Sequence, residues 1–160
     1  GAYADGLIVD AVIAASQQQA AELWRVREAA EIIVREMSPF VSFDVSVDVR
    51  RVEAFSREAK QALISRFPAL QTATFGHLGD NNIHIAAHIG PETMAHEMDI
   101  EKIVFDVLRN YNGAITAEHG IGQLKRKFLA EHRSGGEMEM MRRFRLAMDP
   151  EKLLNHDVMF

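Results

Sequence analysis

The sequence predicts an α+β domain in which helices cover a mostly antiparallel sheet. Runs with helical spacing of apolar residues alternate with short strand-like runs. Two of the strand-like runs flank a four-residue turn, which is typical of a β-hairpin. No repeat or low-complexity tract divides the 160 residues, and the four prolines are scattered. We therefore expect one domain over residues 1–160.

The first half of the chain predicts four elements. Residues 7–14 are apolar and partly β-branched, which favours a strand, and residues 17–34 carry a helical stripe of apolar side chains. Residues 43–49 alternate apolar with polar side chains, the period of a strand with one buried face. Residues 52–67 predict a second long helix, because Pro68 cannot continue it.

A hairpin is expected over residues 71–89. Strands 72–77 and 82–89 flank Leu78-Gly79-Asp80-Asn81, whose residues are typical of turns. The hairpin would bring His77 and His84 face to face near its tip. Further along the chain the sequence predicts a helix at 93–111, a short strand at 114–117, helical structure from 121 and an amphipathic helix at 137–148.

Composition excludes several classes of function. Apolar residues make up 48% of the chain and the net charge is −5, so we expect a packed core and no nucleic-acid partner. The absence of cysteine excludes disulfides, thiolate metal sites and a cysteine nucleophile. The apolar runs are shorter than a membrane span and no secretory leader is recognisable. We expect a cytoplasmic protein, with association at a membrane periphery left open.

Histidines and carboxylates concentrate in two places. His77, Asp80, His84 and His88 fall within twelve positions, and Glu118 adjoins His119. Two imidazoles and one carboxylate would suit Zn²⁺, Mn²⁺ or Fe²⁺ with open positions for a substrate oxygen. The alternative is that these histidines only stabilise the turn, and their spacing favours neither interpretation. For Asp80 we favour a structural hydrogen bond within the turn.

The segment Glu118–Gly122 places an acid and a base before two glycines, where a ligand can approach the backbone closely. His119 is a candidate general base, because imidazole titrates near neutral pH. An ordinary glycine turn is the alternative. We expect Lys125-Arg126-Lys127 to be a solvated helix face, with help in binding an anionic substrate as the alternative. Arg27 would either pair on the surface or bind a substrate carboxylate.

Three segments together resemble the C-terminal domain of FAD-linked oxidases, a family that includes D-lactate dehydrogenases, glycolate oxidase subunits and D-2-hydroxyglutarate dehydrogenases. The segments are 76–84, 115–122 and 148–155, with weaker similarity at 23–28 and 43–47. In that family an N-terminal domain, absent from this chain, holds FAD, and this domain caps the flavin. The resemblance implies oxidation of a D-2-hydroxy acid to a 2-oxo acid, with hydride transfer to the flavin.

The resemblance also implies roles for particular residues. His77, His84 and Glu118 would bind a divalent metal, His119 would be the base, and Arg27 and Asn82 would bind substrate. The expected partners are the hydroxy acid and the FAD-binding domain of the same enzyme, with a homodimer left open. The isolated chain should have no dehydrogenase activity, because it supplies no electron acceptor.

The chain departs from the family pattern at Asn81, Ala86 and Ser42, and residues 155–158 differ from the ending of the family's last motif. Asn81 replaces a turn glycine, a tolerable change because Asn accepts positive φ better than most residues. Ala86 stands where some members carry a substrate-contacting asparagine, and Ser42 where some carry lysine, which leaves the particular hydroxy acid open. Two other functions stay open: a stand-alone module that binds metal or a small acid without redox work, and a structural domain that docks a flavoprotein.

Overall fold

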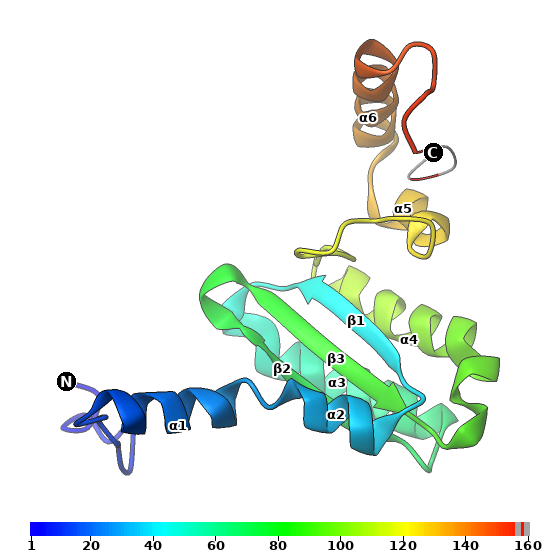
Figure 1. Ribbon diagram of the computed structural model, residues 1–160. Helices are drawn as coiled ribbons and strands as arrows, with labels where there is room; N and C mark the ends of the chain where they lie inside the picture. Colours follow the sequence, from blue (N-terminus) through cyan, green and yellow to red (C-terminus); the bar gives the residue numbers. More distant parts are fainter. Residues whose placement is uncertain (156–157, 159–160) are drawn as a thin grey trace. The chain divides into compact units, whose positions relative to one another are not determined.

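The structure is a computed structural model that describes residues 1–155 and 158. It contains two compact units, residues 1–36 and residues 37–160. Strands and the helices that pack on them make up the second unit, which confirms the α+β class (Figure 1). The assignment of all 160 residues to one substrate-side domain stays a prediction. No described helix is both long and apolar enough to cross a membrane.

Helices α1 (Gln17–Arg27) and α2 (Ala30–Met37) form where one helix was predicted. Ser16 caps the start of α1 by accepting a hydrogen bond from the backbone N–H of Gln19, and Glu28 is the C-cap. The strand predicted at 7–14 is wrong, since those residues have no regular structure. A strand needs a neighbour for its backbone hydrogen bonds, and the described sheet gives this run none.

Three antiparallel strands form the sheet, in the order β1-β3-β2. Their bounds are Val41–Ser46 for β1, Gln71–His77 for β2 and Asn82–His88 for β3. The predicted hairpin and strand 43–49 are thereby confirmed, each with small shifts at its ends. The strand predicted at 114–117 is reduced to one bridge between Ser46 and Ala114. Beyond that bridge the backbone N–H of Ala117 is shared between the carbonyl oxygen and the carboxylate of Asp44, and the ladder does not continue.

One face of the sheet is the core of the unit. Its residues alternate along β1 and β3 and are nearly inaccessible: Val41, Phe43, Val45, Ile83, Ile85 and Ala87. Helices α3 (Val52–Arg66) and α4 (Glu97–Asn110) cover this face (Figure 1). Phe43 meets Phe105 of α4 edge to face, with ring centroids 5.6 Å apart. Both predicted helices are confirmed, except that residues 91–96 form a 3₁₀ helix before α4.

Helices α5 (Arg126–His132) and α6 (Gly135–Met148) follow. The start of α5 lies later than the predicted position 121, because residues 122–124 form turns. Phe128 of α5 packs on Phe105 with ring centroids 4.7 Å apart, which joins α5 to the core. A capping box between Ser134 and Glu137 begins α6, two residues before the predicted start.

Candidate functional site

The second face of the sheet carries the polar residues of the alternation. Residue His84 of β3 lies in register with Asp44 of β1 and Phe75 of β2. His77 ends β2, opposite Asn82. The imidazole centroids of His77 and His84 are 5.5 Å apart and their planes nearly perpendicular. The hairpin thus brings the two histidines together, as its predicted register requires.

The tip of the hairpin fixes this pair. Residues 78–80 form a 3₁₀ turn, and Asn81 follows with φ of 56°, which confirms that asparagine takes the left-handed position. The Asn81 Oδ1 atom accepts a hydrogen bond from the backbone N–H of Val49 at 2.8 Å. The sequence predicts a structural hydrogen bond for the Asp80 side chain. The side-chain hydrogen bond that the structure describes at this turn is made by Asn81. Gly76 is required for space, because a Cβ there would lie 2.2 Å from the Asn82 carbonyl oxygen.

Loop 116–119 is held by one carboxylate. Asp44 is only 3% exposed, and its Oδ2 atom accepts hydrogen bonds from the backbone N–H groups of Ala117, Glu118 and His119 at 3.2, 3.0 and 2.8 Å. The Thr116 hydroxyl lies 3.2 Å from the same oxygen. Successive N–H groups turned toward one anion form a compact backbone nest. This nest sets the positions from which the Glu118 and His119 side chains project.

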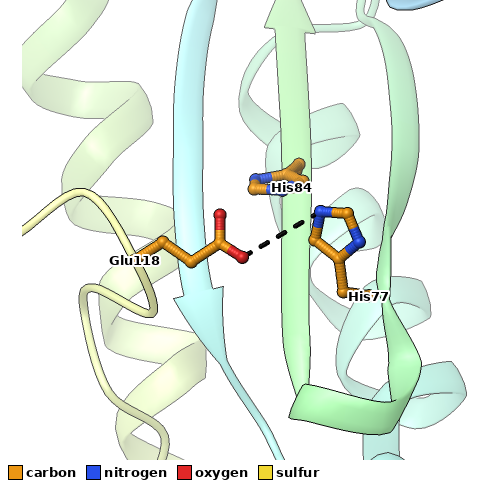
Figure 2. Close-up of side chains that lie close together, drawn as sticks. All are labelled: His77, His84 and Glu118. Atoms are coloured by element: carbon orange, nitrogen blue, oxygen red, sulfur yellow. Dashed lines mark ion pairs between the residues drawn. The ribbon is translucent and has the colours of Figure 1, made fainter. Parts of the chain in front are cut away.

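Glu118 projects toward the two histidines (Figure 2). Its Oε1 atom lies 4.0 Å from Nε2 of His77. One potential ligand atom from each of His77, His84 and Glu118 lies within 4.8 Å of the others. Small side-chain rotations would therefore bring all three to bonding distance of one ion. Two imidazoles and a carboxylate suit zinc, manganese or iron, so the donor set fits the predicted metal.

A second group, formed by Asp44, Glu118 and His119, satisfies the same distance criterion. It is the weaker candidate, because Asp44 is only 3% exposed, its Oδ2 atom already accepts the backbone hydrogen bonds of the loop, and its Oδ1 atom faces His84 rather than His119. A metal ion at Oδ2 would compete with those donors for the same lone pairs. The structure therefore favours His77, His84 and Glu118 as the ligand group.

His119, the predicted base, lies beside this cluster. Its ring stacks on that of His84, with centroids 5.8 Å apart and planes 17° from parallel. The Nδ1 atom lies 3.7 Å from Asp44 Oδ2. The side chain is 66% exposed, so a small molecule can reach the ring from solvent. Its position is compatible with the predicted role as a base.

The other two predicted substrate residues lie in different surroundings. Asn82 is on the histidine face but is buried, and neither polar atom of its side chain has a hydrogen-bond partner among the described residues. Arg27 belongs to the N-terminal unit. Its guanidinium lies 5.5 Å from the Trp24 ring centroid, beside a shallow hollow lined also by Ala14, Ala20 and Leu23. Substrate binding by Asn82 and Arg27 stays a prediction.

The prediction that Lys125 lies on a solvated helix face is wrong. Because α5 begins at Arg126, Lys125 lies in the preceding turn, with only 14% of its side chain exposed. Its Nζ atom donates to the backbone carbonyl of Asp44 at 3.3 Å and lies 3.8 Å from Oδ2. Lys127 instead pairs with Glu101, their charged atoms 2.7 Å apart.

Asp44 keeps its charge despite its burial. Burial raises the pKa of this carboxyl, but the hydrogen bonds from the His119 and Glu118 backbone and the charges of His119 and Lys125 together lower it below its ordinary value. For Lys125, burial lowers the pKa, and the attraction of Asp44 and Glu101 offsets this only in part. The carboxylate is therefore stabilised chiefly by the loop backbone and less by the lysine.

Sequence reasoning missed Asp44 and Lys125 as parts of the site. A signal for Asp44 was present, because residues 43–49 alternate and their polar positions share one face. The alternation shows that Asp44 lies beside His84 only when β1 is known to pair with β3. For Lys125 the sequence offers no such signal, since its burial depends on where α5 begins.

Comparison with known proteins identifies the family. Residues 2–158 match the family described as FAD linked oxidases, C-terminal domain. The chain is 33% identical over 161 aligned residues to a D-2-hydroxyglutarate dehydrogenase of Stutzerimonas stutzeri, covering 97% of this chain and 34% of that protein. It therefore belongs to the family of FAD-linked oxidase C-terminal domains, which confirms the resemblance seen in the motifs.

Two further relatives carry the same enzyme name. A D-2-hydroxyglutarate dehydrogenase of Xanthomonas citri pv. viticola is 34% identical, over 97% of this chain and 34% of its own length. A mitochondrial D-2-hydroxyglutarate dehydrogenase of Rattus norvegicus is 28% identical, over 94% of this chain and 28% of its own length. The chain thus spans about a third of the length of the curated relatives it matches.

Proposed function

We propose that this chain is the substrate-side domain of an FAD-dependent D-2-hydroxy acid dehydrogenase, with D-2-hydroxyglutarate as the first substrate to test. The observation that carries the proposal is the cluster of His77, His84 and Glu118 beside the exposed ring of His119. Family membership supports flavin chemistry, and the names of the relatives support this substrate. FAD, held by another part of the complete enzyme, would accept a hydride.

We propose that the three clustered side chains hold a divalent ion. His77 and His84 would each donate a ring nitrogen and Glu118 a carboxylate oxygen, which leaves coordination positions for a substrate. An ion there would lower the pKa of a bound 2-hydroxyl group and fix its oxygen. Because two ligands lie on paired strands and the third on an anchored loop, the protein would hold the group ready before substrate binds.

His119 would take the proton of the 2-hydroxyl group. Its Nδ1 atom is the nitrogen nearer Asp44, so Nε2 is our candidate for the proton acceptor. Loss of that proton to His119 and of the C2 hydride to the flavin would convert the alcohol to a 2-oxo acid. Arg27 remains our candidate for the substrate carboxylate, since a guanidinium can make two parallel hydrogen bonds to it.

Turnover by the complete flavin-loaded protein tests this function. D-2-hydroxyglutarate should reduce an artificial electron acceptor, and His119→Asn should lower kcat by a factor of about 10² to 10⁴, the usual contribution of a general base. The chain by itself should show no turnover. His132→Asn is the matched control, because this imidazole contacts the backbone carbonyls of Phe128 and Phe105 and should not affect the chemical step.

Two results would count against the proposal. Equal kcat in wild type and His119→Asn would exclude His119 as the base. An ion bound by the wild type, together with no turnover of any 2-hydroxy acid by the flavin-loaded protein, would favour the module without redox activity.

A further inference from the structure

The Oδ1 atom of Asp44 lies beside the candidate metal-ligand group and is buried. While Oδ2 accepts the hydrogen bonds of loop 116–119, Oδ1 is buried and has no hydrogen-bond partner in the part of the chain that the structure describes. An unsatisfied buried carboxylate oxygen is costly, and such a group calls for an explanation. The nearest titratable partner of Oδ1 is Nδ1 of His84, 3.7 Å away.

This geometry distinguishes the two nitrogens of His84. Nδ1 is turned toward Asp44, which leaves Nε2 as the nitrogen able to bind an ion. A neutral imidazole carries one proton, and a nearby carboxylate favours that proton on the nitrogen that faces it. Histidines that bind metals commonly donate their other N–H to a carboxylate, which orients the ring and selects the tautomer.

We infer that Asp44 is a positioning residue that orients both the His84 ring and the loop carrying Glu118 and His119. Through Oδ1 it selects the His84 tautomer with the proton on Nδ1, and through Oδ2 it places the loop that carries Glu118 and His119. The inference deepens the proposed function, on which it rests. Lys125 assists by donating to the Asp44 backbone carbonyl and by placing its charge 3.8 Å from Oδ2.

The variant Asp44→Asn separates these two tasks. The amide oxygen of this variant can still accept hydrogen bonds from the loop N–H groups if it takes the position of Oδ2. An NH₂ group in the position of Oδ2 would instead face those N–H donors. The NH₂ group must therefore take the place of Oδ1, where it donates to Nδ1 of His84. The proton of the ring then moves to Nε2, which removes the lone pair that an ion needs. The loop is kept, whereas an ion must displace that proton before it can bind His84.

Binding of Zn²⁺ to the metal-free chain, measured by competition with a chelating dye, is the first readout. We expect the Kd to rise about 10- to 100-fold in Asp44→Asn, the usual effect of losing such a partner. Asp48→Asn is the matched control on the same segment, because Asp48 forms a surface pair with Arg50 and should leave the Kd unchanged. His84→Ala reports whether the ion uses this cluster at all.

The second readout needs no metal. Nitrogen-15 NMR of the imidazoles at about pH 8, above the ordinary histidine range, should show the His84 proton on Nδ1 in wild type and on Nε2 in Asp44→Asn. Amide exchange at Glu118 and His119 should stay slow in Asp44→Asn and become fast in Asp44→Ala. A purely structural Asp44 would alter exchange in Asp44→Ala but would change neither tautomer nor Kd in Asp44→Asn.

The possible failures are distinguishable. If His84→Ala loses Zn²⁺ while Asp44→Asn binds it as the wild type does, the metal site stands and the role of Asp44 is overturned. If the wild type binds no ion but its His84 tautomer changes in Asp44→Asn, the positioning role stands and the metal part of the proposed function fails. The same tautomer in both proteins would overturn the inference.

Discussion

The two faces of the same three-stranded sheet differ in almost every property. The face covered by α3 and α4 is apolar and closely packed, and it contains no titratable group among the described strand residues. The opposite face brings together a buried carboxylate, two histidines and an anchored loop. Because strand side chains alternate, neighbouring residues serve opposite faces. Substitutions on the first face should therefore change stability, and those on the second should change binding.

The largest loss of stability is expected beneath the packed face. Phe55 of α3 is fully buried and meets Tyr111 edge to face, with ring centroids 5.6 Å apart. Phe55→Ala should lower the free energy of unfolding by about 3–5 kcal/mol, because it removes apolar contacts and leaves a cavity. Urea denaturation measures the loss. Phe75→Ala, an exposed phenylalanine on the polar face, should cost about 1 kcal/mol or less, and equal losses would break the comparison.

A smaller loss is expected where the hairpin strands approach most closely. In Gly76→Ala the new Cβ would meet the Asn82 carbonyl oxygen, so β2 must move from β3 at a cost of about 1–3 kcal/mol. Since His77 follows directly, Zn²⁺ affinity should fall as well. Gly79→Ala is the control, because a Cβ at that position meets nothing within 4 Å. Unchanged denaturation of Gly76→Ala would show that the strands can separate freely.

On the polar face, binding should change more than stability. His84→Ala should lower the free energy of unfolding by about 1 kcal/mol. Metal content, measured by mass spectrometry after dialysis, should fall from about one ion per chain to none, because one of three ligands is lost. His88→Ala is the matched control on the same strand and face; its Nδ1 atom contacts the Pro39 carbonyl oxygen 2.7 Å away. Loss of the ion in both variants would exclude a specific cluster.

The smallest effect concerns an element outside both faces. The Glu137 carboxylate accepts hydrogen bonds from the backbone and hydroxyl of Ser134, which lower its pKa. A lowered folded pKa contributes stability above the ordinary carboxyl range and loses it as pH falls through the folded value. Wild type should therefore be slightly more stable than Glu137→Gln at pH 7. Thermal unfolding should show this advantage disappearing on acidification below about pH 4; a constant difference would refute it.

Local patterns predicted most of the second unit. The strand-like runs 72–77 and 82–89 with the turn residues 78–81 were sufficient for the hairpin, whose register places His77 beside His84. Alternation in 43–49 was sufficient for β1. The prediction of a strand at 7–14 was wrong because an apolar run indicates β-propensity but does not show that a neighbouring strand is present to pair with it. The predicted short strand 114–117 does not continue past its bridge, and the N–H of Ala117 is shared between the carbonyl oxygen and the carboxylate of Asp44, a residue far away in sequence.

The approach of Glu118 to the histidines could not be predicted from spacing. It depends on a carboxylate in β1 that captures the loop backbone, and sequence patterns do not reveal such a long-range polar contact. Its ligand role was expected from its residue type and from the family resemblance, but not from any predicted contact. Lys125 was misassigned for a related reason, since the helix starts at Arg126 and not at the predicted position 121, and this decides between a solvated and a buried side chain.

The position of β3 between its two neighbours has a consequence for kinetics. His84 lies on a strand whose backbone is bonded on both sides, and His77 on a strand paired with it, whereas Glu118 lies on a loop held mainly by one carboxylate. Local opening of such a loop requires less free energy than opening a paired sheet. The residence time of anything bound at the cluster would then be set by the loop, so it could change greatly between related sequences whose melting temperatures are the same.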